Sequence, residues 1–154
     1  MSGGPIEPSE QQLAELAAVA GTDDDGPVTM LNLNRYRDRA DYGDGPPDGV
    51  DPDVSGQEAY GRYGEVAMRA IAELGAAIVW HTESPGTVIG REDDRFHEVV
   101  AVWYPSRTAF LGLLGVEGYP EALAHRTAAL ERAMVICTDG PSEPHLDPLT
   151  APRS

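Results

Sequence analysis

The sequence predicts an α+β fold in which two helical segments cover one face of a four-stranded antiparallel sheet. Four runs rich in β-branched and aromatic residues alternate with segments of helical periodicity. Apart from a leading helix, their order is β-α-β-β-α-β, the split βαβ or ferredoxin-like order. Right-handed crossovers place both helices on the same face of such a sheet. The length of 154 residues suits one compact domain.

A tail and an extra helix precede the sheet. The segment SEQQLAELAAVAG begins with Ser9 and Gln12 in capping-box spacing and ends in a glycine, which is a natural helix stop. A TDDDGP turn then leads into the first strand at about 27–36. Residues 1–26 are therefore expected to lie outside a barrel domain at 27–138.

A long loop follows the first strand. Residues 38–54 contain six aspartates together with glycines and prolines, and a loop of this length is unusual inside a domain. It is either a mobile insertion or a flap over a pocket. The next helix, SGQEAYGRYGEVAMRAIAELG, opens with the capping pair Ser55 and Glu58.

The second half of the chain supplies the other elements. Strands are expected at 76–83 and at 96–104, FHEVVAVWY. The second helix is broken in two by glycines, and its second part, PEALAHRTAALER, has Pro120 in its first turn. The last strand, AMVICT, is expected at 133–138, and residues 139–154 form a C-terminal tail.

One face of this sheet is expected to need a partner. If Leu31 and Leu33 of the first strand face the helices, the opposite face is mostly apolar and should not remain in water. The residues expected there are Met30, Val99, Ala101 and Trp103. A second copy would cover this face, so the sequence predicts a homodimer that encloses a barrel-like lumen.

The composition excludes several classes of protein. A net charge of −15 argues against nucleic acid and anionic membranes as partners. The chain has no lysine, which excludes a lysine Schiff base and a Walker motif. Cys137 is the single cysteine, so no internal disulfide forms. The N-terminus has no signal-peptide pattern and no apolar run could span a membrane, which predicts a cytoplasmic protein.

The segments MLNLNRYR, AYGRYG, VVAVWYPSRTAF and HRTAALERA together resemble DUF1330, a family of unassigned function within the dimeric α+β barrel superfamily. The most specific piece is YPSR at 104–107. The resemblance covers roughly 27–137 without the long loop, and it implies a ferredoxin-like fold and a dimer. Superfamily relatives include cofactor-independent monooxygenases, isomerases, cyclases, haem-handling enzymes and stress-response proteins, so no single reaction is implied. Asn34 and His97 depart from the usual family residues.

Four polar residues end the first strand. If its leucines face the helices, the amides of Asn32 and Asn34 face the lumen and bind a carbonyl or hydroxyl of a ligand. The alternative is that they bridge to a neighbouring strand or hold water. Arg35 and Tyr36 would lie at the barrel mouth, where Arg35 binds a carboxylate or enolate or pairs with an aspartate of the long loop.

Three histidines are candidates for the site. His81 is a general base if Ile78 and Trp80 pack on the helices and turn it into the lumen. The opposite registry is possible because this strand is apolar on both faces. His97 is a substrate-binding candidate, with a solvated strand end as the alternative. His125 on the last helix is another, with an interhelical hydrogen bond as the alternative.

Two aromatic residues complete the candidate set. Tyr63 could donate a proton to substrate, or lie in the core with its hydroxyl paired. Trp103 offers a flat surface for an aromatic ligand, or for dimer packing. The histidines lack metal-binding spacing and no nucleotide-binding pattern is present, so no metal and no cofactor are expected.

The leading hypothesis is a cofactor-independent enzyme of secondary or degradative metabolism that isomerises, cyclises or oxygenates an enolisable organic metabolite. His81 would be the base, Tyr63 the acid, and Asn32, Asn34 and Arg35 the stabilisers of oxyanion charge. The alternative is a non-catalytic small-molecule-binding or accessory protein with the same fold.

Overall fold

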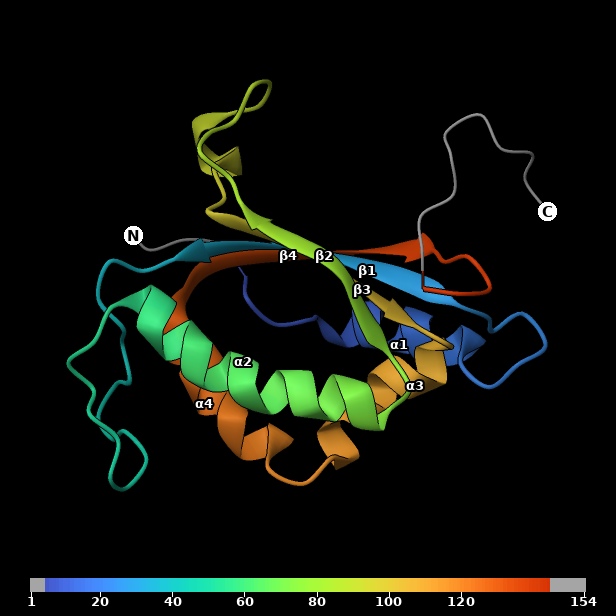
Figure 1. Cartoon of the computed structure of the whole chain (residues 1–154), viewed down its shortest axis with the longest axis horizontal. Helices are drawn as coiled ribbons and strands as arrows, with labels where there is room; N and C mark the ends of the chain where they lie inside the picture. Colours follow the sequence, from blue (N-terminus) through green and yellow to red (C-terminus); the bar gives the residue numbers. More distant parts are fainter. Residues whose placement is uncertain (1–4, 145–154) are drawn as a thin grey trace.

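The computed structural model describes residues 5–144 and shows a four-stranded sheet with its main helices on one side (Figure 1). The strands pair antiparallel in the order β2-β3-β1-β4. Their bounds are β1 Val28–Tyr36, β2 Ala77–Glu83, β3 Glu98–Tyr104 and β4 Leu130–Asp139. The α-helices are α1 Glu10–Val19, α2 Gly56–Glu73, α3 Arg107–Leu111 and α4 Tyr119–Ala129. Two 3₁₀ turns are η1 Glu92–Asp94 and η2 Gly112–Gly115. The predicted ferredoxin-like α+β fold and its extra N-terminal helix are confirmed.

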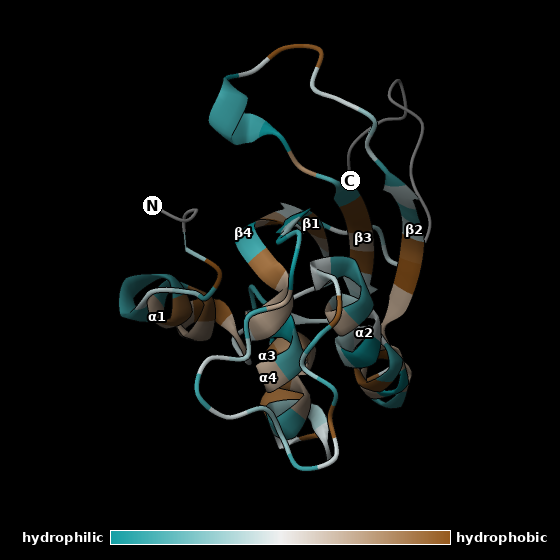
Figure 2. Ribbon diagram, turned by 90° about the vertical axis from the view of Figure 1, so that its left-hand side faces the viewer, coloured by the Kyte–Doolittle hydropathy of each residue, from teal (hydrophilic) through white to brown (hydrophobic). Residues whose placement is uncertain are grey.

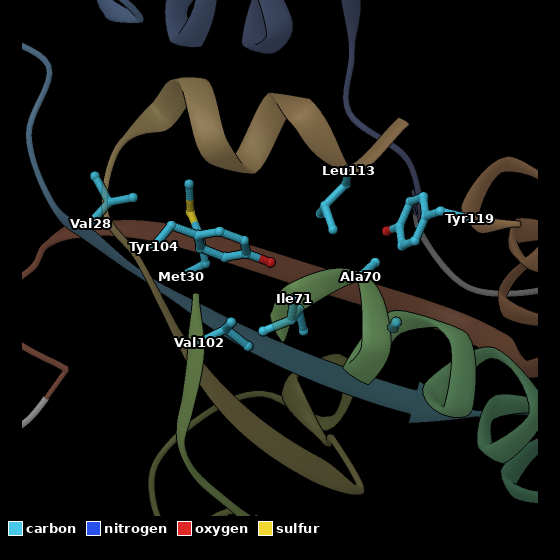
Figure 3. Packing of buried hydrophobic residues seen from close by; sticks show 9 residues of the cluster. Val28, Met30, Ala70, Ile71, Val102, Tyr104, Leu113 and Tyr119 are labelled. Atoms are coloured by element: carbon cyan, nitrogen blue, oxygen red, sulfur yellow. The ribbon is translucent and has the colours of Figure 1, made fainter. Parts of the chain in front are cut away.

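The main core lies between the sheet and α2. Met30 and Tyr104 lie side by side on the helix-facing side of the sheet, and Ile71 of α2 meets Val102 of β3 (Figure 3). Leu113 of η2 closes the cluster. All five side chains are less than 10% exposed, and full burial of such a side chain stabilises the fold by about 1.5–3 kcal/mol.

The start of α2 is fixed by its cap and by close contact with the end of β1. The Ser55 hydroxyl accepts from the Glu58 N–H at 3.0 Å, and the Glu58 side chain accepts from the Ser55 N–H at 3.4 Å. These are the two bonds of the predicted capping box. Gly56 then donates its N–H to the Arg37 carbonyl at 3.1 Å. This contact holds α2 against the exit of β1.

The predicted orientation of β1 is wrong. Met30 pairs with Val102 and is 2% exposed in the core under the helices. Asn32 and Asn34 alternate with the leucines and so share the face of Met30, while Leu31 and Leu33 lie on the uncovered face. The expectation of lumen-facing amides and of Met30 on the open face is corrected accordingly. Both faces of this strand carry two large apolar side chains, so alternation alone could not assign them.

The last helix is shorter than expected, and the strand after it is longer. α4 ends at Ala129 rather than at 132, and β4 begins at Leu130. Leu130 is fully buried and pairs with Tyr36 across a register shift in the ladder. The Arg37 N–H donates to the Ala129 carbonyl at 2.8 Å. Pairing with β1 therefore overrides the helical propensity of the sequence LER.

The long loop is docked on the helices. The Asp41 N–H donates to the Ala128 carbonyl at 2.9 Å, and the Ala40 N–H donates to the Val54 carbonyl at 2.9 Å. Tyr42 reaches α2 and α4 through its hydroxyl. The predicted tails fall partly at 1–4 and 145–154, and those parts lie outside the described residues.

Candidate functional site

A cavity of about 550 Å³ opens where β1 and β2 end and β3 begins. Residues from four elements line it, and the ones used below are Tyr36, Arg37, Ser55, Glu83, His97 and Glu98. It lies at one end of the sheet, beside the start of α2. Both ends of the long loop reach this cavity, since Arg37 and Asp38 line it together with Ser55.

The centre of the cavity wall is a tyrosine–carboxylate pair. The Tyr36 hydroxyl donates to Glu98 Oε1 at 2.5 Å. Burial, and then the hydrogen bond and charge of Glu98, raise the pKa of Tyr36 above its usual value. The hydroxyl therefore stays protonated at neutral pH and keeps one Glu98 oxygen in place.

His97 is held by the backbone of the same tyrosine. Its Nδ1 accepts the Tyr36 N–H at 2.9 Å, and the two rings are stacked with centroids 5.9 Å apart. Because Nδ1 is occupied as an acceptor, the neutral ring carries its proton on Nε2. His97 can thus donate a hydrogen bond from Nε2 without disturbing its contact with β1.

Asn34 presents an unpaired buried donor. The residue is 2% exposed, and its Nδ2 has no hydrogen-bond partner among the described residues. Its amide lies beside the Tyr36 and Tyr60 hydroxyls and slightly offsets the rise in their pKa, which burial causes first. A buried donor without a partner costs about 1–3 kcal/mol. Such a group is suited to a ligand oxygen or to an ordered water.

A row of tyrosines runs from the cavity into the core. The ring centroids of Tyr36 and Tyr60 are 5.3 Å apart, those of Tyr60 and Tyr63 are 5.2 Å apart, and those of Tyr63 and Tyr119 are 5.8 Å apart. The hydroxyls of Tyr63 and Tyr119 are hydrogen-bonded at 2.8 Å. Burial, and then Tyr119, raise the pKa of Tyr63. Tyr63 is thus committed to a core partner and does not line the cavity.

His81 lies apart from the cavity lining. A register shift in β2 between Ile78 and Trp80 pairs Trp80 with Ala101 and His81 with Val100. Ile78 packs on the helix-side core, whereas Trp80 joins the uncovered face and is 40% exposed. The condition under which His81 would face a lumen, with Ile78 and Trp80 both on the helices, is therefore not met. The bulge adds one residue to β2, so His81 lies opposite Val100 and on the same, helix-facing side of the sheet. Because β2 is an edge strand, His81 is nevertheless exposed.

Arg35 and Asn32 are engaged elsewhere. Arg35 Nε pairs with Glu131 Oε2 at 3.0 Å, so its acidic partner comes from β4 rather than from the long loop. The Asn32 amide donates to the Met30 carbonyl at 3.1 Å and to the Val100 carbonyl at 3.3 Å. Asn32 therefore bridges to the neighbouring strand, which was the alternative to ligand binding for the two asparagines.

Trp103 and His125 also lie outside the cavity lining. Trp103 is on the uncovered face, where its Nε1 donates to the Pro141 carbonyl at 2.9 Å. His125 Nδ1 bonds the Tyr42 hydroxyl at 2.7 Å, and that hydroxyl also accepts from Arg62 at 2.9 Å. Burial, and then Arg62, lower the pKa of His125. His125 therefore holds the long loop rather than an interhelical partner.

The structure brings together three of the expected residues, Asn34, Tyr36 and His97, and adds two that sequence reasoning missed. Glu98 and Tyr60 complete the tyrosine–glutamate site, which we define as Asn34, Tyr36, Tyr60, His97 and Glu98. A single carboxylate opening the apolar run EVVAVWY was the available signal for Glu98. The sequence offered no comparable signal for Tyr60 beyond its helical spacing, because a helical tyrosine is more often part of the core.

Two further findings concern residues 5–144. No group of three or more His, Cys, Asp or Glu side chains in this range is placed to hold a metal ion. Within the same range, no helix combines the length and apolar character needed to cross a membrane. The cytoplasmic location and the lack of a nucleic-acid partner stay predictions from the sequence.

The fold and the cavity define a ferredoxin-like α+β protein with a polar site at one end of its sheet. The family model described as domain of unknown function (DUF1330) matches residues 50–139, and the chain therefore belongs to this family. Among curated proteins none matches.

Two solved structures are similar over almost the whole chain. The structure of the methylated RPA0582 protein is 34% identical, with a TM-score of 0.77, and the match covers 97% of this chain and all of that one. The RPA0582 protein of unknown function from Rhodopseudomonas palustris is 33% identical, with a TM-score of 0.75, and covers 94% and 99% of the two chains.

Proposed function

We propose that this protein is a cofactor-independent enzyme that moves a proton on a small, enolisable organic metabolite. The observation that carries the proposal is the Tyr36–Glu98 pair in the wall of a cavity of about 550 Å³. A positioned carboxylate and a fixed donor in one cavity are the components that enolisation needs. Glu98 takes the role that the sequence had suggested for His81, because Glu98 lines the cavity.

In the proposed reaction, a Glu98 oxygen removes a proton from the carbon next to the substrate carbonyl. The C–H electron pair forms the enol double bond, and the carbonyl oxygen becomes an enolate. His97 Nε2–H donates to this oxygen, while the Asn34 amide lies behind Tyr36 and outside the cavity lining. Return of the same proton to another atom of the conjugated system gives an isomer, so the step needs no oxidant or reductant.

Tyr36 keeps the base in position. Its hydroxyl remains protonated because burial and Glu98 raise its pKa, so it binds one carboxylate oxygen and leaves the other for substrate. Loss of this bond should misplace Glu98 rather than remove the base. Tyr36→Phe should therefore reduce turnover less than Glu98→Gln does.

The test is deuterium exchange at carbon. The protein is incubated in D₂O with a panel of β-keto acids, β-keto esters and β-diketones, and incorporation is followed by proton NMR. We expect exchange above the buffer rate for at least one class, and a loss on the order of 100-fold in Glu98→Gln. Glu65→Gln, on the exposed side of α2, is the matched control and should exchange as wild type does.

Exchange that is unchanged in Glu98→Gln contradicts this assignment. Compounds that bind in the cavity without exchange would instead favour the alternative, a non-catalytic binding protein. Native mass spectrometry of the protein purified from its own organism would identify a retained ligand for either case.

We also infer that the working unit is a homodimer formed through the uncovered face of the sheet. Trp80, Met134 and Ile136 are 38–42% exposed there, which is costly for side chains of this size. The chain carries 26 acidic residues, yet none of the paired strand positions on this face is Asp or Glu. A second, equally acidic copy can approach such a face, because the nearby carboxylate of β4, Glu131, is already paired with Arg35.

A further inference from the structure

The connection between β2 and β3 forms an arm. Residues 84–97 leave the sheet on the side opposite the helices and project beyond it (Figure 1). The strongly apolar part of the arm lies near its outer end (Figure 2). The two aliphatic side chains of this tip, Val88 and Ile89, are 97% and 94% exposed. They are far more exposed than the apolar residues of the sheet face.

The arm is anchored at its base. Arg132, on the uncovered face of β4, donates to the Asp93 carbonyl and lies 3.8 Å from Asp94 Oδ1. Its guanidinium also lies 5.2 Å from the centre of the Phe96 ring. Asp94 in turn accepts the Arg91 N–H at 2.8 Å. These contacts fix the arm against β4, so its apolar tip is presented without a large loss of chain entropy on binding.

The surroundings of the tip indicate its partner. The arm projects on the same side as the uncovered sheet face, which carries no carboxylate on its paired strand positions. Three acidic residues, Glu92, Asp93 and Asp94, follow the tip, and the chain has a net charge of −15. Anionic membranes and nucleic acids are repelled by this charge, whereas a second copy would approach through its own uncovered face, whose paired strand positions hold no carboxylate. A second copy seated on the uncovered face would lie on the side of the sheet from which the arm projects.

We propose that the arm is a dimer clasp, in which Val88 and Ile89 of each protomer pack against a second copy of this chain. The proposal rests on the homodimer inferred above. In this arrangement the arm adds a contact between the two copies beyond the packing of their sheet faces. Because two-fold symmetry applies the contact twice, loss of both tips should weaken association on the order of 100-fold.

The test is the dimer dissociation constant by sedimentation equilibrium. The double variant Val88→Asp/Ile89→Asp is compared with wild type and with Met68→Asp/Leu114→Asp. The control pair is 61% and 62% exposed and lies on α2 and η2, away from the uncovered face. We expect the arm variant to raise the dissociation constant on the order of 100-fold and the control to leave it unchanged.

Two additional measurements separate the possible results. Circular dichroism must show that the arm variant is folded, and Val88→Ala/Ile89→Ala should give a smaller rise in the same direction. A folded arm variant with the wild-type constant overturns the clasp. If Ile136→Asp on the sheet face dissociates the dimer while the arm variant does not, the homodimer stands and the clasp fails. A wild-type chain that stays monomeric overturns both, whereas the deuterium-exchange test of the enzyme remains independent.

Discussion

Two asparagines on one strand face have opposite environments. Asn32 donates to two backbone carbonyls, whereas the Nδ2 of Asn34 has no partner within residues 5–144 and the residue is 2% exposed. An unpaired buried amide reduces stability, and sites that hold such groups commonly do so for function. The amide that weakens the fold is therefore the one beside the Tyr36 and Tyr60 hydroxyls of the site.

The pair makes a matched test. Asn34→Leu removes the unpaired amide with little change in size, so we expect it to raise the free energy of unfolding by about 1 kcal/mol. Asn32→Leu removes two hydrogen bonds and should lower it by about 1 kcal/mol. Urea denaturation measures both. Equal effects of the same sign would show that the Asn34 amide is satisfied in solution, by water for example.

At the scale of elements, contact between α2 and the exit of β1 positions the tyrosine–glutamate site. Gly56 begins α2, and a Cβ placed there would lie 2.2 Å from the Arg37 carbonyl oxygen and 2.8 Å from that of Ala129. Both are backbone atoms, which cannot move aside as a flexible side chain can. Only glycine allows α2 to approach this closely, and that approach brings Ser55 to the cavity.

Gly56→Ala is expected to destabilise the protein by about 1–3 kcal/mol, because the helix start must move away from β1. Gly61→Ala is the control, since it lies in the same helix with nothing within 4 Å of the added Cβ. It should stabilise by up to about 1 kcal/mol through helix propensity. Chemical denaturation compares the two, and a stabilising Gly56→Ala would contradict the close packing.

The turn before β1 is tied to α3 by one carboxylate. Asp25 accepts hydrogen bonds from the backbone N–H groups of Gly21, Arg107 and Thr108, and from the Thr108 hydroxyl. The Gly21 bond first, and then those from α3, lower the pKa of Asp25 to about 2. This carboxylate links the end of α1 to the start of α3.

A depressed carboxyl pKa stabilises the fold above the unfolded value, near pH 4, and the stabilisation is lost as pH falls toward 2. Asp25→Asn should therefore lower the melting temperature at pH 7, and its difference from wild type should shrink between pH 4 and 2. Asp24→Asn, at the exposed neighbouring position, should show no such dependence. Calorimetry across this range provides the measurement, and a difference independent of pH would argue against the link.

At the scale of the whole molecule, the fold buries five tyrosines whose hydroxyls stay protonated. Burial is the first cause of a raised pKa in Tyr36, Tyr60, Tyr63, Tyr104 and Tyr119. In each case the folded chain holds its proton at pH values where the unfolded chain releases it. Stability is therefore complete below about pH 10 and falls as pH rises above it.

Each such tyrosine lowers the free energy of unfolding by up to about 1.4 kcal/mol per pH unit above 10. We expect a cooperative alkaline transition in which absorbance at 295 nm and circular dichroism change together. Tyr104→Phe removes one of these groups and should move the transition to higher pH if its packing is kept. Gradual ionisation at pH 10 in a folded chain would contradict the burial of these hydroxyls.

The sequence determined the order of elements, their caps and the fold. Capping pairs at Ser9 and Ser55, Pro120 in the first turn of its helix and the apolar runs are local signals, and handedness rules convert their order into one topology. The structure bears out each of these features. Local signals suffice here because each depends on residues only a few positions apart.

Tertiary structure alone decided which face each strand presents and where the site lies. Alternation shows that Met30 and Asn34 share a face, but only packing against α2 shows which face that is. The bulge that moves His81 in β2 and the meeting of Glu98 with Tyr36 both arise from pairing between distant strands. Side-chain spacing along one strand carries no information about its partner, so the tyrosine–glutamate site became visible only in the folded chain.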